Sequence, residues 1–282
     1  MNGILLINKE KGVTSRDVVN QVEKILKTKK IGHTGTLDPM ATGVLVLCIG
    51  SSLKLVEMLM NHDKEYIANI QLGIETDTLD VTGKTLKTQE VRPITKIEIE
   101  EVLKKFEGKI KQEVPKYSAI KVNGKKLYEY ARQGIEVELP IREIEIFKIE
   151  LLGDMINNTF QIRCVVSKGT YIRSLIRDIA HALGTIGVMS ELKRTRVGAF
   201  SIENTYSISN VEKGFYQLLT PQDVLDIPHY IVDEELEKKI RNGCVLDAFF
   251  KENMMMILDQ NHNLLAIYQQ NGLGKVKPYR MF

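Results

Sequence analysis

The sequence predicts an α+β protein in which a main domain with a central, largely antiparallel mixed sheet flanked by helices precedes a small β-rich module. Three observations predict this fold class. Strand and helix patterns follow one another in mixed order, apolar and polar residues alternate between Tyr66 and Leu72, and after about Pro228 short apolar runs lie between polar turns. We therefore expect one domain over residues 1–227 and a second over residues 228–282.

The N-terminal elements can be assigned from local patterns. The apolar run Ile4–Ile7 predicts a short buried strand. Thr14 and Asp17 have the spacing of a capping box, which predicts that a helix begins here. Apolar residues then recur at helical spacing, and lysines crowd the expected C-terminal end, where the helix dipole favours cations. These apolar residues are Val18, Val19, Val22, Ile25 and Leu26.

Further along the chain, strands and helices alternate without a fixed order. We expect strands at Val44–Ile49, Tyr66–Leu72, Ile144–Leu152 and Phe160–Val166. Helices are predicted at Leu53–Met60, around Ile99–Phe106, around Leu127–Ala131 and from Ile172 to Leu183. Gly134 and Gly184 follow the last two helices, as glycine commonly does at a helix C-terminus.

Composition excludes several classes of protein. Of 282 residues, 43% are hydrophobic and 27% are charged, so the chain can form a packed core and wholesale disorder is not expected. The net charge of +3 excludes a polybasic coat but allows a local basic groove. There is no apolar run of about 18 residues for a membrane helix and no signal-peptide pattern. We therefore expect a cytoplasmic protein with no membrane partner.

The three cysteines and five histidines show no metal-ligand spacing, so no metal is expected. Cys48, Cys164 and Cys244 lie far apart among apolar neighbours. We interpret them as buried free thiols in a reducing compartment.

The loop Gly32–Gly43 holds the first candidate catalytic residue. It is rich in glycine and proline but lacks the lysine and spacing of a phosphate-binding loop. Asp38 precedes Pro39, which restricts its backbone, so the loop could present its carboxylate as a nucleophile or base. The simpler interpretation, an aspartate that caps a turn, stays open.

Two further candidates have equally ordinary explanations. Tyr66 could stack on a base, although a tyrosine near the start of a strand more often packs in a core. Arg173 and Arg177 lie one turn apart on a predicted helix. One of them could pair with a carboxylate, because a neighbouring cation favours its charged form. Alternatively, both belong to a solvated face with Asp178 nearby.

Charge is distributed unevenly. Residues 104–126 hold eight lysines against two glutamates, with Tyr117 inside the stretch and Tyr128 and Tyr130 just beyond it. A second basic group lies between Arg173 and Arg196. Cations with interleaved aromatics suit a phosphate backbone with unstacked bases, so the two groups favour a polyanionic substrate.

Four blocks in the same order together resemble one known family. They are Gly32–Leu45 (GHTGTLDPMATGVL), Asp63–Tyr66 (DKEY), Pro115–Gly134 (PKYSAIKVNGKKLYEYARQG) and Ser167–Arg173 (SKGTYIR). The likeness spans roughly residues 2–200 and is to the TruB family of bacterial tRNA pseudouridine-55 synthases. It implies a pseudouridine synthase fold and an isomerase that converts a uridine of the tRNA T loop to pseudouridine. The reaction needs no cofactor and no metal.

The resemblance also implies roles for single residues. Asp38 matches the nucleophile, Arg173 its partner, and Tyr66 a tyrosine that stacks on the flipped base and helps to remove the C5 proton. His33 matches a residue that holds the T loop open, and Lys9 one that supports the catalytic loop. Tyr171 and Leu192 match residues that line the uracil pocket. The expected RNA contacts are Lys121, Lys125, Lys126, Arg177, Lys193 and Arg194.

The expected partner is the T arm of tRNA, bound by a monomer. His229–Phe282 is short for the PUA-type β-domain that usually ends members of the family, so we expect a reduced PUA-like module. Two other functions remain open: a non-catalytic RNA-binding protein on the same scaffold, and a synthase that a guide RNA directs to another RNA. The joint presence of Asp38, Tyr66 and Arg173 favours an enzyme over a pure binder.

Overall fold

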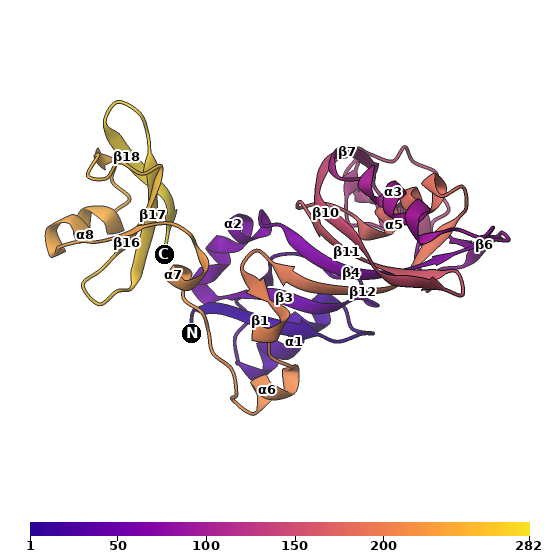
Figure 1. Ribbon diagram of the computed structural model, residues 1–282. Helices are drawn as coiled ribbons and strands as arrows, with labels where there is room; N and C mark the ends of the chain where they lie inside the picture. Colours follow the sequence, from indigo (N-terminus) through magenta and orange to yellow (C-terminus); the bar gives the residue numbers. More distant parts are fainter.

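The computed structural model describes residues 1–282 and contains two main sheets, together with two small two-stranded hairpins (Figure 1). The larger has nine strands, in the order β1-β3-β12-β4-β11-β10-β7, with β2 paired to β3 and β13 to β12. Their bounds are β1 Gly3–Lys9, β2 Ile31–His33, β3 Thr42–Ile49, β4 Lys64–Leu72, β7 Gly108–Glu113, β10 Ile141–Ile156, β11 Thr159–Val166, β12 Gly187–Val197 and β13 Phe200–Ser201. Neighbouring strands run antiparallel except β3 and β12, which confirms the predicted mixed, largely antiparallel sheet.

Three helices cover this sheet. They are α1 (Ser15–Ile25), α3 (Lys96–Lys104) and α5 (Ile172–Ala182). The capping box predicted at Thr14 is present, because the Thr14 side chain accepts from Asp17 N and the Asp17 side chain from Thr14 N. The apolar faces of α3 and α5 pack on β4, β10, β11 and β12 in the largest core cluster. A separate cluster joins α1 to β1 and β3.

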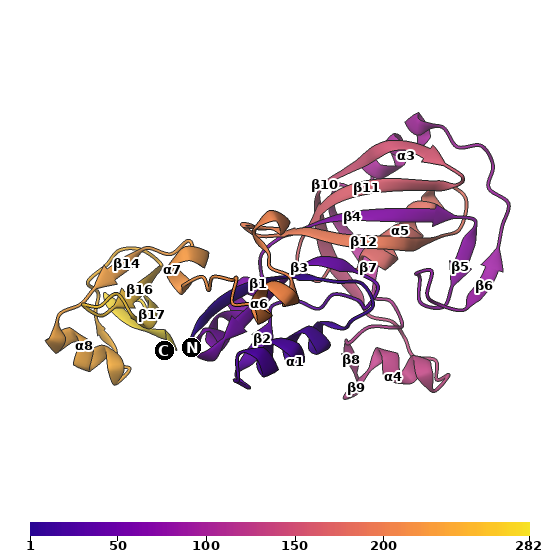
Figure 2. The ribbon, with the colours of Figure 1, turned by 90° about the horizontal axis from the view of Figure 1, so that it is seen from below.

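Some elements differ from the sequence-based expectation. The helix expected at Leu53–Met60 begins earlier as a 3-10 helix, Gly50–Leu55, and continues as α2, Val56–Met60. The basic stretch 104–126 is not one element, because it includes the end of α3, the edge strand β7 and part of a small hairpin. We call residues Lys121–Arg132 the basic hairpin; it consists of β8 (Lys121–Val122), β9 (Lys125–Lys126) and α4 (Leu127–Arg132), and it projects from the sheet (Figure 2). A second small hairpin pairs β5 (Ile74–Thr76) with β6 (Thr85–Thr88).

The chain returns to the first sheet before it enters the second one. Leu219 and Ile4 bond to each other through their backbones, and Tyr206 N donates to Leu6 O. Two short helices, α6 (Ile208–Glu212) and α7 (Pro221–Val224), lie along this segment. The second sheet has the order β14-β16-β17-β18-β15, with α8 (Glu234–Arg241) beside it. Its strands are β14 His229–Ile231, β15 Leu246–Asp247, β16 Met254–Leu258, β17 Leu264–Gln270 and β18 Lys275–Met281.

Two of the three cysteines are buried as expected. Burial raises the pKa of the Cys48 and Cys164 thiols to about 12. Cys244 is half-buried, so the expectation of three buried thiols is wrong for this one. None of the helices combines the length and the apolar character needed to cross a membrane.

Candidate active site

The loop that carries Asp38 joins β2 to β3 and is held by hydrogen bonds to Lys9 and Ser15. Lys9 is fully buried, and its Nζ donates to the carbonyls of Val13 at 2.7 Å and Pro39 at 3.3 Å. Leu37 N donates to the Ser15 hydroxyl at 2.9 Å. Burial lowers the pKa of Lys9 to about 8, against the opposing effect of the Asp38 charge. These contacts hold the loop in one conformation beneath the cleft.

Arg194 supports the loop from the side. It lies on β12, is only 2% exposed, and donates from Nε to Val44 O at 2.8 Å and from Nη2 to Gly35 O at 3.1 Å. Its own backbone passes so close to Gly43 that a Cβ there would lie 2.1 Å from the Arg194 carbonyl oxygen. Gly43 also has φ of +104°, a conformation that side chains disfavour. Glycine is therefore required at position 43.

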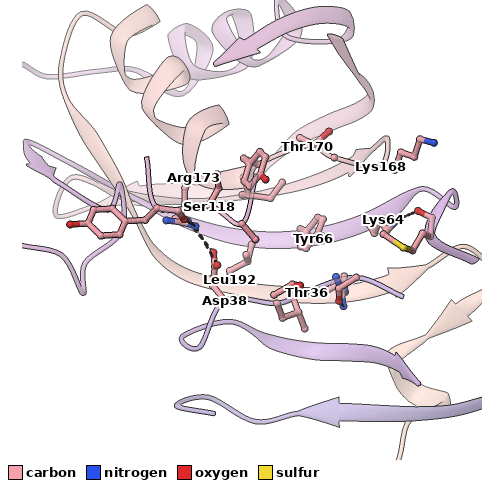
Figure 3. Close-up of a pocket in the computed structure, with 18 of the residues that line it drawn as sticks. Thr36, Asp38, Lys64, Tyr66, Ser118, Lys168, Thr170, Arg173 and Leu192 are labelled. Carbon is pink, nitrogen blue, oxygen red and sulfur yellow. Dashed lines mark hydrogen bonds and ion pairs between the residues drawn. The ribbon is translucent and has the colours of Figure 1, made fainter. Parts of the chain in front are cut away.

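Asp38 and Arg173 form a two-point ion pair. Arg173 Nε lies 2.9 Å from Asp38 Oδ2, and Nη2 lies 3.3 Å from Oδ1 (Figure 3). The Arg173 side chain is 7% exposed, whereas the Asp38 side chain is 35% exposed. Two parallel bonds fix the direction of a carboxylate as well as its position. The pair therefore leaves one side of a fixed carboxylate open to the cleft.

Arg173 also binds two other segments of the chain. It donates to Thr78 O at 2.9 Å and to Tyr117 O at 3.0 Å, and Nη1 lies 3.8 Å from the buried carboxylate of Asp80. Asp80 in turn accepts from Thr82 N at 2.9 Å. Asp80 is a site residue that sequence reasoning missed. The only local signal was a polar Thr-Asp-Thr-Leu-Asp loop, which gives no indication of a distant arginine.

A cleft of about 1610 Å³ opens in front of Asp38. Tyr66 on β4 and Leu192 on β12 line it and are nearly buried, at 8% and 7% exposure. Tyr171 lies at the start of α5, and burial raises the pKa of its phenol. The backbone of Tyr171 is held by Gln112, which accepts from its N–H at 2.8 Å and donates to its carbonyl at 3.1 Å. Tyr66, Tyr171 and Leu192 thus add aromatic and aliphatic surface to the lining beside the ion pair of Asp38.

Lys64 is a second site residue that was not predicted. It lies two residues before Tyr66, is 7% exposed, and lines the same cleft. Its Nζ donates to Met60 O at 2.8 Å and to His62 O at 2.5 Å. Burial, followed by the charge of Arg194, lowers the pKa of Lys64 to about 8.

The structure brings six predicted residues together and places others elsewhere. Asp38, Tyr66, Tyr171, Arg173 and Leu192 line one cleft, together with Arg194. Arg194 was expected as an RNA contact, but its buried guanidinium supports the Asp38 loop, so a surface phosphate contact does not fit it.

Lys9 and His33 lie outside the lining of this cleft. Lys9 holds the loop from behind, as the resemblance implied, rather than facing a substrate. Burial, and then the charges of Arg194 and Arg16, lower the pKa of His33. Lys193 is exposed and lines a separate cavity of about 220 Å³.

The remaining predicted RNA contacts lie away from Asp38. Arg177 is half-buried and pairs with Glu113 and with Asp178, each at 2.8 Å, so the neighbour Asp178 is its partner but the face is only partly solvated. Lys121, Lys125 and Lys126 lie on the basic hairpin. Tyr128 and Arg132 of the same hairpin line the cleft, so the hairpin forms one end of it.

Comparison with known proteins identifies related sequences along the whole chain. Residues 23–172 match the model of the TruB family pseudouridylate synthase N-terminal domain. Residues 173–241 match that of the tRNA pseudouridylate synthase B C-terminal domain. The chain is 46% identical to tRNA pseudouridine synthase B of Oceanobacillus iheyensis, over 100% of this chain and 98% of the relative. It is 41% identical to the protein of that name from Halalkalibacterium halodurans, over 100% and 97%.

The fold is also similar to that of a solved structure. This is a chain in the structure of an H/ACA RNP bound to a substrate RNA containing 2′-deoxyuridine. The TM-score is 0.72, with 24% identity, and the match covers 99% of this chain and 84% of the other. At this identity the likeness supports the fold alone.

Proposed function

The chain belongs to the TruB family of tRNA pseudouridine synthases, and from this we propose that it isomerises uridine 55 in the T loop of tRNA with Asp38 as the nucleophile. That it is an isomerase with tRNA pseudouridine synthase B activity follows from its full-length relatives. The position in the tRNA and the roles of single residues are our proposal. The observation that carries it is the Asp38–Arg173 ion pair at the wall of the cleft.

The reaction needs a fixed anion next to the ribose. Breaking the bond between uracil N1 and ribose C1′ develops positive character at C1′, as in glycoside hydrolysis. A carboxylate that attacks C1′, or instead C6 of the base, allows uracil to detach and turn. The C5–C1′ bond then forms, C5 loses its proton and N1 gains one, so there is no net oxidation. Arg173 fixes the Asp38 carboxylate, and the exposed side of that carboxylate faces the cleft.

The uridine must leave the stacked loop to reach Asp38, at a cost of a few kcal/mol. Tyr66 can recover part of this cost by stacking on the base, and its hydroxyl could help to remove the C5 proton. Leu192 and Tyr171 close the cleft around the uracil. They would exclude water, which would otherwise trap the detached sugar as a hydrolysed product.

To bind the phosphates of the RNA backbone, the protein needs cations outside the part of the cleft that holds the uracil. Lys121 on the basic hairpin and Lys193 are exposed, whereas Lys125 and Lys126 of the hairpin are half-buried, each beside a tyrosine ring. These four lysines are the phosphate contacts of our proposal. Each such contact steepens the fall of affinity with salt concentration. We propose that the hairpin grips the T arm while a monomer inserts the flipped uridine into the cleft.

The proposal can be tested with purified protein and an unmodified full-length tRNA transcript. Mapping should find pseudouridine at position 55, formed without added metal, nucleotide or partner protein. A matched transcript with cytidine at that position should show no product. No turnover of the uridine transcript without partner proteins would overturn the proposal and favour an RNA-directed synthase.

A further inference from the structure

The cleft does not end at Tyr66. Beyond that ring, on the side away from Asp38, it continues past Lys64 and Lys168 (Figure 3). Its lining there includes Glu57, Met60 and Asn61 at the end of α2, and Tyr279 of β18. A site for one small ligand usually measures about 300–1,000 Å³, so the volume of about 1610 Å³ exceeds what one nucleotide needs. We call this part, lined by Glu57, Met60, Asn61, Lys168 and Tyr279, the distal arm.

Tyr279 enters the distal arm from a β-bulge. Tyr268 pairs with Pro278 and Ile267 with Arg280, so Tyr279 is an extra residue with no partner on β17. A bulge of this kind re-aims a side chain and is common next to functional sites. The neighbouring Arg280 guanidinium lies 5.1 Å from the centre of the Tyr279 ring.

The C-terminal sheet is held firmly against the first one at this point. Arg280 forms an ion pair with Glu57, and Lys54 Nζ donates to Met281 O at 2.7 Å. A single apolar cluster joins the two sheets. It includes Leu55, Leu59, Met256, Ile267, Tyr279 and Phe282. These contacts fix Tyr279 at the wall of the cleft.

Two lysines bring positive charge to the lining of the cleft in and beside the distal arm. Lys168 lies in the turn before α5 and is exposed, and its Nζ donates to Asn61 Oδ1 at 2.6 Å. Lys64 lies nearby, with its Nζ bound to two carbonyls. Lys168 is therefore the exposed cation of the distal arm, and it can meet a ligand by exchanging its bond to Asn61.

We propose that the distal arm binds the RNA strand that adjoins the target uridine, with Tyr279 stacked on a base and Lys168 bound to a phosphate. The proposal rests on the proposed function, because it takes the RNA in the cleft as the occupant. Aromatic rings and cations that line one groove are the usual combination for binding single-stranded RNA. Continuity with the cleft in front of Asp38 favours the substrate itself over a separate partner protein. The C-terminal module then takes part in substrate binding.

The first test measures the affinity for a full-length tRNA transcript. Tyr279→Ala should weaken binding at least about fivefold, because base–aromatic stacking is lost, while Tyr279→Phe should stay within about twofold of wild type. Lys277→Ala is the matched control, since Lys277 lies on the same strand but does not line the cleft. Wild-type affinity in Tyr279→Ala would overturn the proposal.

The second test avoids the contact between the two sheets. Lys168→Ala lies outside that contact, and it should lower the slope of log Kd against log salt by about 1, as the loss of one phosphate contact does. An unchanged slope would overturn the phosphate contact. Failure of the proposed function would look different, because wild-type protein would then form no pseudouridine at position 55, whatever the affinities of these variants.

Discussion

The inner end of the cleft and the basic hairpin both carry cations, but those of the cleft are buried and those of the hairpin are exposed or half-buried. Arg173 and Arg194 are both buried. Arg173 donates to Asp38 Oδ1 and to Thr78 O. Arg194 donates to Val44 O and Gly35 O. On the hairpin, Lys121 is exposed, while Lys125 lies 5.0 Å from the centre of the Tyr130 ring and Lys126 lies 5.4 Å from that of Tyr128.

This difference separates two uses of positive charge. Burying a cation costs several kcal/mol unless it makes good hydrogen bonds. The same hydrogen bonds hold the acceptor groups of a buried arginine in place. An exposed lysine costs little to keep and remains available to phosphates. We therefore expect variants of the inner group to change turnover or folding, and variants of the hairpin to change RNA affinity and its salt dependence.

The largest effect is expected for Asp38→Asn. The amide keeps the size of the side chain but removes the proposed nucleophile, so turnover should fall by at least about a thousandfold. Single-turnover assays with excess enzyme measure this loss directly. Binding of the tRNA transcript should change less than about threefold, because Asp38 contributes no phosphate contact.

A variant of the basic hairpin is the control for Asp38→Asn. Lys121→Ala should weaken RNA binding and flatten its salt dependence, yet leave the rate at saturating enzyme near that of wild type. If Asp38→Asn lost affinity and rate equally, the division between the two regions would be wrong.

Arg194→Met and Lys193→Ala compare adjacent residues on the two faces of β12. Losing the buried guanidinium leaves the carbonyls of Gly35 and Val44 without their donor, so unfolding should become easier by about 3 kcal/mol. Lys193→Ala should change stability by less than about 0.5 kcal/mol. Denaturant titrations of both variants check this, and equal stabilities would mean that Arg194 is not a support for the loop.

Tyr66→Ala should lower the rate by roughly 5- to 100-fold if the ring acts by stacking, which is worth about 1–3 kcal/mol per base. Under that role alone, Tyr66→Phe retains most of the activity. Rate measurements at saturating enzyme compare the two variants. An inactive Phe variant would assign a chemical role to the hydroxyl.

A more gradual effect should appear in the pH dependence of stability. Burial lowers the pKa of Lys64 from 10.5 to about 8 in the folded protein. The unfolded chain therefore binds more protons than the folded one between about pH 8 and pH 10.5, and stability should rise with pH across this window. Relative to Lys64→Met, wild type should gain about 3 kcal/mol across the whole window, since a change of one pH unit in a pKa corresponds to about 1.4 kcal/mol. If the free energies of unfolding of the two proteins changed with pH in the same way, the folded protein would not bury the charge of Lys64.

Local sequence patterns predicted the parts of the fold that depend on neighbours in the chain. The capping box at Thr14 and the alternation from Tyr66 to Leu72 both correspond to observed elements. The Asp38 loop stood out because its glycines and proline lie within a dozen residues. The pairing of Asp38 with Arg173, 135 residues apart, came from the resemblance and not from any local pattern.

Other features depend on contacts that a single sequence does not specify. Asp80 reaches Arg173 only because two loops meet at the start of α5. Tyr279 faces the cleft because of the register between β17 and β18. Arg194 is different, since the alternation along β12 buries Leu192 and Arg194 and exposes Lys193. The period-two pattern could have separated these residues, but the strand was not recognised.

The central claim is that Arg173 holds Asp38 for reaction instead of binding RNA. The measurement that tests it most directly is Arg173→Ala, with turnover and tRNA affinity determined on the same preparation. We expect turnover to fall by on the order of a hundredfold or more, since the variant leaves a carboxylate without its partner, while affinity changes by less than about threefold. Equal losses in rate and affinity would show that Arg173 is a phosphate contact and would contradict the account.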